Sequence, residues 1–382
     1  MFKKKILFIT SSVDSDRRAD FLLDLIVSLN KEVFMPVFVD IAGGKYNRNA
    51  GDAGIETIDL DVPTELLELK EADIFNPLKF TGLMKGYSAL KDLKKYIREE
   101  KITHIYSNGS LSHMLAALAA RSCGIVSVWH TREYFRPPVQ YFVKIASVLP
   151  TRIISNSKFV AEQYLNSNKI TIVSDGVQIE KVAATGRWEE VREKMGIPLD
   201  ARIIGTMASG EAAVRTLSFI EVAEKICRRK KNVFFVISGD FNSAVCDEKQ
   251  KLIRIVNEMG IAHRVMIEEV NGNRYDLMNE FDIFIGADFD YRYEVFDVLD
   301  AMSMGKSVIV GSEGAFKEII NNGENGIFAQ LEDTDYIEEI IVNLLDNPEV
   351  MKALGDNARN LIRRSYDLKD QNSRIETILK GL

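Results

Sequence analysis

Long apolar runs and cysteine pairs are both missing from this chain of 382 residues. No run approaches the roughly 18 apolar residues that a helix needs to span a bilayer, so no transmembrane segment is expected. The apolar run near the amino terminus, Ile6 to Ile9, is too short for a secretion signal and is typical of a buried first strand. The three cysteines lie far apart without a Cys-x-x-Cys pair, which indicates reduced thiols in a cytoplasmic protein.

Positive charge and histidine are also in short supply. The chain has 49 Lys and Arg residues against 56 Asp and Glu residues, and the net charge of -7 argues against a general nucleic-acid binder. The four histidines and three cysteines form no cluster with metal-ligand spacing, so no metal is expected. A hydrophobic fraction of 46% with 27% charged residues describes a soluble globular protein and not a disordered one.

Strand-like and helix-like patterns alternate along the chain. Short apolar runs such as Val233 to Ile237 are separated by segments with helical spacing, which predicts an α/β protein with parallel sheets and crossover helices. The length allows two domains. A polar stretch with glycine and proline, residues 178–200, is interpreted as the linker between a first domain (1–177) and a second one (201–365).

The stretch from Tyr293 to Phe328 carries the most specific pattern. A helix is predicted over Val295 to Met304, followed by a short buried strand, Ser307 to Val310. The turn Gly311 to Gly314 then lies at the carboxyl end of that strand, where open α/β sheets bind their ligands. The next helix, from about Ala315, points its amino end at the same place, and helix amino ends attract phosphate. The pattern therefore predicts a ligand that carries phosphate.

The same stretch resembles the nucleotide-sugar signature of the family 4 glycosyltransferases, also called glycosyl transferases group 1. The matching residues, in order and in spacing, are Asp300-Ala301-Met302, Gly305-Lys306-Ser307-Val308, Glu318 and Asn325-Gly326. The first Glu of the family's pair falls on Arg292, or on Glu294 if two residues are missing from the turn, and the second is the shorter Asp300.

This resemblance implies the GT-B fold, in which two Rossmann-like domains face each other across a cleft. The first domain would hold the acceptor and be joined by a carboxyl-terminal helix, residues 366–382, while the second would hold the nucleotide sugar. The implied activity is transfer of a sugar from a nucleotide-sugar donor to a glycan, lipid or small-molecule acceptor, with retention of configuration and without a metal or other cofactor.

The donor site departs from the family pattern. Thr206 and Glu211 stand where the family has an Arg and a Lys that stabilise the departing diphosphate. Arg215 and Arg292 are the nearby cations that would substitute, and each is equally well explained as a solvated surface residue. The residues expected to bind the donor are Ser209, Gly210, Arg215, Arg292, Glu294, Asp300 and Gly314.

A histidine follows the predicted strand Ile125 to Trp129. His130 and the two charged residues after it, Arg132 and Glu133, stand at the carboxyl end of that strand, where an active-site crevice is expected. A similar His-x-Arg-Glu follows the corresponding strand in many members of the resembled family. His130 is therefore the expected catalytic residue, with a structural histidine as the alternative. Ser12, Arg132 and Glu133 are expected on the acceptor side.

Three questions stay open at this level. The basic amphipathic segment 79–101 is either a contact with an anionic membrane surface, at the inner face of the membrane, or a solvated helix face. The altered donor signature allows a non-enzymatic partner or scaffold for another glycosyltransferase as the alternative to an enzyme. A different sugar- or nucleotide-modifying enzyme of the same architecture, such as an epimerase, is a third reading.

Overall fold

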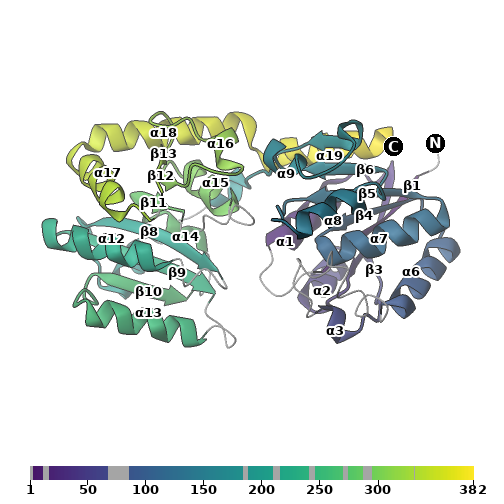
Figure 1. The fold of residues 1–382 in the computed structure, drawn as a ribbon, viewed down its shortest axis with the longest axis horizontal. Coiled ribbons are helices and arrows are strands. Elements are labelled where there is room, and N and C mark those ends of the chain that lie inside the picture. Colours follow the sequence, from purple (N-terminus) through teal and green to yellow (C-terminus); the bar gives the residue numbers. More distant parts are fainter. Residues whose placement is uncertain are drawn as a thin grey trace. The chain divides into compact units, whose positions relative to one another are not determined.

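Two compact units make up the chain in the computed structural model (Figure 1): Met1–Ser174 with Gln371–Leu382 form unit 1, and Asp175–Asp370 form unit 2. The structure describes residues 3–11, 17–67, 86–183, 188–209, 216–240, 246–269, 274–286, 295–330 and 332–382. Each unit is built around its own parallel sheet, so the predicted α/β class is confirmed.

Unit 1 alternates strands and helices from its first described residues. Its strands are β1 (Lys4–Thr10), β2 (Phe34–Asp40), β3 (Glu56–Thr57), β4 (His104–Asn108), β5 (Val126–Thr131), β6 (Arg152–Ser155) and β7 (Ile170–Ile172). Its helices are α1 (Arg17–Ser28), α2 (Lys45–Asp52), α3 (Thr64–Leu67), α6 (Tyr87–Glu99), α7 (Ser110–Cys123), α8 (Val139–Ala146), α9 (Lys158–Ala161), the 3-10 turn η2 (Ser167–Lys169) and most of α19 (Leu368–Gly381).

The sheet of unit 1 has seven strands in the order β3-β2-β1-β4-β5-β6-β7. Its strands alternate between two faces, and both faces are buried. One face packs on α1, α2 and α19, through residues such as Phe8 and Ile375. The other packs on α6 and α7, through residues such as Ile105 and Leu93. The strand order reverses between β1 and β4, so the carboxyl ends of these strands border the place where such sheets bind ligands.

Unit 2 repeats this plan. Its strands are β8 (Arg202–Ser209), β9 (Val233–Asp240), β10 (Val265–Glu269), β11 (Ile283–Ile285), β12 (Ser307–Val310) and β13 (Ile327–Phe328). Its helices are α10 (Ile179–Ala183), α11 (Trp188–Met195), α12 (Thr216–Arg229), α13 (Cys246–Glu258), α14 (Arg274–Met278), α15 (Val295–Ser303), α16 (Phe316–Ile319), α17 (Thr334–Asp346) and α18 (Pro348–Ser365).

The sheet of unit 2 has six strands in the order β10-β9-β8-β11-β12-β13, and its order reverses between β8 and β11. Helices α12, α13 and α17 cover one face, with Phe219 and Ile341 in the core. Helices α14, α15 and α16 cover the other, with Leu299 and Phe316 in the core. The two units therefore have the same layered architecture, and in each sheet the strand order reverses at one point.

The segment expected as a linker, 178–200, has structure of its own. It contains α10 and α11, and its Val182 and Ile197 are buried in the core of unit 2. Residues 184–187 lie outside the described part. At the other end of the chain, α19 contributes Ile375 and Leu379 to the core of unit 1. The carboxyl-terminal helix thus supplies part of the first unit's packing.

The basic amphipathic segment 79–101 is described from residue 86 onward. Its α6 turns Ala89, Leu93 and Ile97 into the core of unit 1, and Leu90 packs against the same core. These side chains are not exposed for insertion into a lipid surface. Within the described part, α6 is therefore a core helix with a charged outer face.

Candidate active site

His130 lies on β5 at the end of the sheet that carries ligand sites in folds of this kind. The sequence Val-Ser-Val-Trp-His-Thr alternates faces, so Val128 and His130 point to the side covered by α1 and α19. Asn108, the last residue of β4, pairs with His130 in the parallel register. The imidazole is almost fully enclosed, with 3% of its surface exposed.

The neighbours of His130 define which ring nitrogen carries the proton. The Tyr106 hydroxyl lies 2.6 Å from Nδ1, and Nη2 of Arg132 lies 3.5 Å from the same atom. A guanidinium only donates hydrogen bonds, so the nearby Arg132 favours the tautomer in which Nδ1 keeps its lone pair, and the closer Tyr106 hydroxyl then donates to that lone pair. The neutral ring therefore carries its proton on Nε2. Nε2 is buried and has no hydrogen-bond partner among the described residues.

Burial keeps this imidazole uncharged. Desolvation lowers the pKa of His130 well below 6.5, and the charge of Arg132 lowers it further. The side chain is consequently a hydrogen-bond donor through Nε2–H at neutral pH. It is a poor general base, because the pKa of an effective base lies near the working pH.

Arg132 and Glu133 are held in a polar network behind the histidine. Nη1 of Arg132 donates to Oδ1 of Asn108 at 2.8 Å, and the backbone N–H of Arg132 donates to Oε2 of Glu133 at 3.3 Å. Nη1 of Arg18 pairs with Oε1 of Glu133 at 2.7 Å, and Asn108 Nδ2 donates to the backbone oxygen of Arg18 at 3.0 Å. The network fixes the start of α1 to the ends of β4 and β5. Ser12, expected beside these residues, lies outside the described part.

A pocket opens beside His130 within unit 1. Its volume is about 10 Å³, room for about one water molecule, and apolar residues of α1 and α19 form part of its wall. Its polar lining consists of Arg18, Asn108, His130, Arg132, Gln371 and Asn372. The two amides come from α19 and were not anticipated from the sequence, because nothing local to residues 371–372 indicates which face of that helix meets the sheet. Asn108 could have been found from the sequence, because it is a polar residue at the end of a predicted strand, where folds of this kind bind ligands.

The expected donor residues that the structure describes all belong to unit 2. Asp300 lies on α15 with 1% of its surface exposed, and Gly314 follows β12 with a positive φ of 64°, a conformation that favours glycine. Ser209 ends β8. Gly210, Arg215, Arg292 and Glu294 lie outside the described part, as does Glu211.

Thr206, at the position where the resembled family has an Arg, lies inside β8. It pairs with Ile237 of β9 and is completely buried, and its hydroxyl has no hydrogen-bond partner in the described part of the chain. A cation at this position would be buried in the sheet at a high desolvation cost. Positive charge for a diphosphate therefore has to come from elsewhere.

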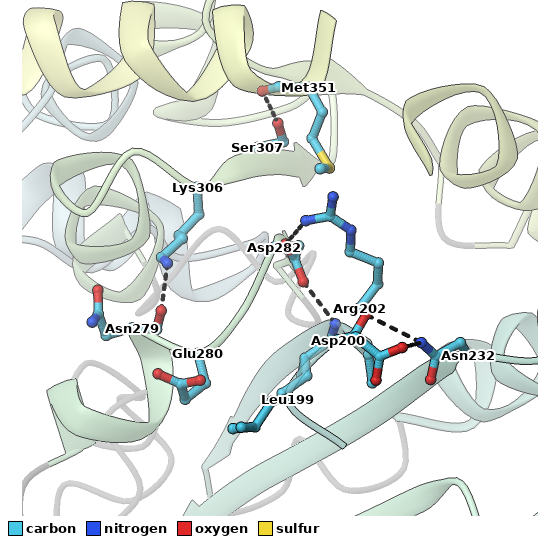
Figure 2. A network of polar contacts seen from close by, with 12 residues as sticks. Leu199, Asp200, Arg202, Asn232, Asn279, Glu280, Asp282, Lys306, Ser307 and Met351 are labelled. Carbon is cyan, nitrogen blue, oxygen red and sulfur yellow. Dashed lines mark hydrogen bonds and ion pairs between the residues drawn. The ribbon is translucent and has the colours of Figure 1, made fainter. Parts of the chain in front are cut away.

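Two other parts of the signature are structural. Asn325 is buried and closes a turn by accepting from the Asn321 N–H at 2.7 Å and donating to the Ile319 oxygen at 3.1 Å. Lys306 lies just before β12, at the opposite end of the sheet from the turn that contains Gly314. Figure 2 shows its Nζ donating to the backbone oxygen of Asn279, at 2.6 Å.

The surroundings of Lys306 form a polar network at the amino ends of the strands of unit 2. In Figure 2, Arg202 pairs with Asp282 and the Ser307 hydroxyl donates to the Met351 backbone oxygen. Burial lowers the pKa of Lys306 to about 8. The network joins β8, β11, β12 and α18, so its role is structural.

Two other features are absent from the described residues. No helix in the described ranges is long and apolar enough to cross a membrane. No group of three or more His, Cys, Asp or Glu side chains in those ranges is placed to hold a metal ion.

Comparison with known proteins gives the class. The family model for glycosyl transferases group 1 matches residues 188–361, and the model for glycosyltransferase family 4 matches residues 58–181. Among the relatives is UDP-Gal:alpha-D-GlcNAc-diphosphoundecaprenol alpha-1,3-galactosyltransferase of Escherichia coli, 23% identical over 78% of this chain and 80% of the relative.

Solved structures share the fold over nearly the full length. A glycosyltransferase from Rickettsia africae superposes with a TM-score of 0.83 at 16% identity, covering 99% of this chain and 98% of the other. HepE from Anabaena, solved in complex with UDP, superposes with a TM-score of 0.81 at 16% identity, covering 99% of this chain and 100% of the other. The chain belongs to the family 4 glycosyltransferases of the GT-B fold, as the sequence signature predicted, and is a transferase.

Proposed function

We propose that this glycosyltransferase moves a hexosyl residue from a uridine diphosphate sugar to a hydroxyl of a glycan, lipid or small molecule, with retention of configuration and without a metal. The name of the Escherichia coli relative includes a UDP-sugar donor, and HepE was solved with UDP and with UDP-glucose. These relatives support a uridine nucleotide for this chain. The acceptor would be met in the cytoplasm, at the inner face of the membrane where it is a lipid.

The observation that carries the proposal is the fixed neutral state of His130. Glycosyl transfer breaks the bond between the sugar and the diphosphate and forms a bond to the acceptor oxygen. The diphosphate leaves without protonation by an acid, and as it gains negative charge it accepts the proton of the acceptor hydroxyl. A buried Nε2–H with no partner in the described part of the chain is a ready donor to an oxygen of the transferred sugar. Because its pKa lies well below 6.5, His130 performs this role without gaining or losing a proton.

Unit 2 supplies the donor contacts in this proposal. The Asp300 carboxylate accepts hydrogen bonds from the ribose diol, and the glycine turn at Gly314 allows the backbone to approach the nucleotide. Ser209, Gly210, Arg215, Arg292 and Glu294 remain the proposed completion of this site. Since Thr206 is buried within β8, Arg215 and Arg292 are the cations proposed to offset the diphosphate charge.

Calorimetric titration of the full chain with uridine and guanosine diphosphate sugars tests the proposal. We expect a uridine diphosphate sugar to bind in the micromolar range, and Arg292→Ala to weaken that binding about tenfold, because a charge-assisted hydrogen bond is lost. Arg374→Ala, which removes an exposed cation from α19, is the matched control. Absence of binding across the panel refutes the proposed donor.

The alternative is a non-enzymatic partner of an active glycosyltransferase, and the buried Thr206 is the observation that favours it. In that case wild type binds nucleotide sugars weakly and Arg292→Ala changes nothing. The same titrations therefore separate the two functions. If wild type and Arg292→Ala both bind at micromolar levels, the result supports the enzyme and shows that Arg292 does not contact the diphosphate.

A further inference from the structure

A row of large, mostly apolar side chains on α8 is exposed to solvent. Tyr141, Ile145 and Val148 are 59%, 64% and 44% exposed. The Val148 N–H donates to the Ile145 oxygen, so the helical path continues past the end of α8 at Ala146. The three residues stand at i, i+4 and i+7, which puts them on one face of the helix. Single exposed apolar residues are ordinary, whereas a contiguous row indicates a binding surface.

The opposite face of α8 already packs on its own unit. Val143 is 1% exposed and belongs to the core of unit 1. The residues partly buried against the same core are Val139, Phe142, Ala146 and Leu149. The exposed row, Tyr141, Ile145 and Val148, is therefore a second apolar face of the helix, which we call the α8 stripe.

Positive charge borders the α8 stripe. Lys144 is exposed and lies three residues after Tyr141 and four before Val148, so it neighbours both on the helix surface. Lys169 donates to the backbone oxygens of Val148 and Pro150, at 3.1 Å and 3.0 Å, and so lies at the carboxyl end of the stripe. In a chain with a net charge of -7, residues 134–172 contain one acidic residue, Glu162, and five basic ones: Arg136, Lys144, Arg152, Lys158 and Lys169.

An anionic lipid surface is complementary to both features. Apolar side chains of an interfacial helix enter the boundary between headgroups and acyl chains, while neighbouring Lys and Arg side chains meet the lipid phosphates. The amphipathic ring of Tyr141 suits the same depth. A second copy of the chain is a poorer match, because a symmetric dimer would place the same cations opposite each other. A stable protein interface also takes about 20–30 residues on each side.

We propose that the α8 stripe docks unit 1 on a membrane that contains anionic lipids, with Lys144 and Lys169 against the lipid phosphates. This surface is distinct from the described part of segment 79–101, whose apolar residues pack in the core. The inference rests on the proposed function in one respect, namely that a lipid acceptor would be met at the surface where α8 docks.

Co-sedimentation of the full chain with lipid vesicles, without nucleotide sugar, tests the docking. One set of vesicles is phosphatidylcholine, and the other is equal parts phosphatidylcholine and phosphatidylglycerol. We expect saturable binding to the anionic set, about tenfold tighter than to the neutral set, because two or more cations contact the charged surface. Added sodium chloride should weaken the binding to the anionic set.

Variants on the surface of unit 1 make the test specific to α8. Ile145→Gln should weaken binding to anionic vesicles about fivefold, because an apolar side chain no longer leaves water. Lys144→Gln should weaken binding to the anionic set about fivefold and leave binding to the neutral set unchanged. Val27→Gln is the matched control, because Val27 is an apolar residue of α1 that is 52% exposed, and its variant should bind as wild type does.

The proposal is overturned if wild type does not bind the anionic vesicles, or if Ile145→Gln binds them as wild type does. Sedimentation velocity tests the other occupant: a dimer that Ile145→Gln dissociates, together with no vesicle binding, would assign the stripe to a second copy. Vesicle binding by a chain that releases no UDP from UDP-sugars would support this docking surface and refute the proposed function. UDP release without vesicle binding would do the reverse, so the two failures are distinguishable.

Discussion

At the scale of single residues, the chemistry of this protein depends on how His130 is held. Its tautomer follows from two neighbours of Nδ1: Tyr106 on β4, whose hydroxyl donates to it at 2.6 Å, and Arg132 after β5, whose guanidinium lies 3.5 Å away. Neither neighbour acts on the substrate in this account. Their contribution is to keep the proton on Nε2, a buried atom of a side chain that lines the pocket.

Replacement of Tyr106 by Phe tests this positioning role. The change removes the hydroxyl that donates to Nδ1, so the proton is no longer confined to Nε2, and we expect kcat to fall about three- to tenfold, as for loss of one hydrogen bond. The donor KM should change much less. Histidine nitrogen spectra should show the Nδ1 and Nε2 signals of His130 moving toward each other.

Tyr96→Phe is the matched control, because Tyr96 also donates a hydrogen bond in unit 1, to Glu56 at 2.9 Å on the surface. It should leave kcat and the His130 signals unchanged. Equal effects of the two variants, or an unchanged tautomer in Tyr106→Phe, would contradict the assignment of the proton to Nε2.

His104 provides a prediction about pH and stability. Its Nδ1–H donates to the Thr103 hydroxyl, which lies 2.7 Å away and itself donates to the Lys5 oxygen. Burial lowers the pKa of His104 to about 4, with a smaller effect of Lys4. Between about pH 6.5 and about pH 4 the unfolded chain therefore binds a proton that the folded chain does not, so the free energy of unfolding falls as the pH falls.

His104→Gln should flatten this dependence. The measurement is the urea midpoint of unit 1, followed by the fluorescence of the buried Trp129 in a Trp188→Phe background, from neutral to mildly acidic pH. His263→Gln, which changes an exposed histidine of unit 2, should keep the wild-type slope. A slope that is the same in His104→Gln as in wild type would show that His104 does not contribute.

At the scale of elements, α18 packs closely against the turn before β12. A Cβ added to Gly355 would lie 2.0 Å from the backbone oxygen of Gly305, and Gly305 itself has a positive φ of 73°. Arg359 of α18 donates to the Met304 oxygen at 2.6 Å beside this contact. The helix can approach the turn only because both positions lack a side chain.

Gly355→Ala should therefore lower the stability of unit 2 by about 1–3 kcal/mol, the usual cost of overpacking. Differential scanning calorimetry of the full chain would show the change. Gly51→Ala in α2 is the control, because an added Cβ there meets nothing within 4 Å, and it should be neutral or stabilising. A Gly355→Ala chain as stable as Gly51→Ala would mean that α18 is free to move away from the turn.

The sequence predicted individual helices and strands better than it predicted which elements pack against one another. Buried parallel strands such as β12 are continuous β-branched runs, and they are readable one by one. Within 178–200, Trp188, Val191 and Met195 stand at helical spacing, but the two helices of this segment span only five and eight residues, and glycine and proline lie beside them, so they were interpreted as a linker. A periodic pattern of about two turns is weak evidence for a helix.

At the scale of the whole molecule, the family signature in the sequence identified the class of protein. The residues that surround His130 could be listed only from the folded structure. His130 lies near the end of β5, and Arg132 and Glu133 follow that strand, so the sequence alone placed them together. Tyr106 and Asn372 join His130 through strand pairing and through the return of α19 to unit 1. Such contacts between distant parts of the chain have no local pattern, and they decide the tautomer and the lining of the pocket.

The measurement that tests the central claim most directly is release of UDP from UDP-glucose and UDP-galactose as a function of pH, in wild type and in His130→Gln. We predict release by wild type, with water or an added acceptor pool as second substrate, and a rate about tenfold lower in the variant. Because the pKa of His130 lies well below 6.5, the wild-type profile should show no inflection near 6.5 that the variant lacks. Equal rates in the two proteins, or an acid limb near 6.5 that disappears in His130→Gln, would contradict a neutral His130 acting as a hydrogen-bond donor in sugar transfer.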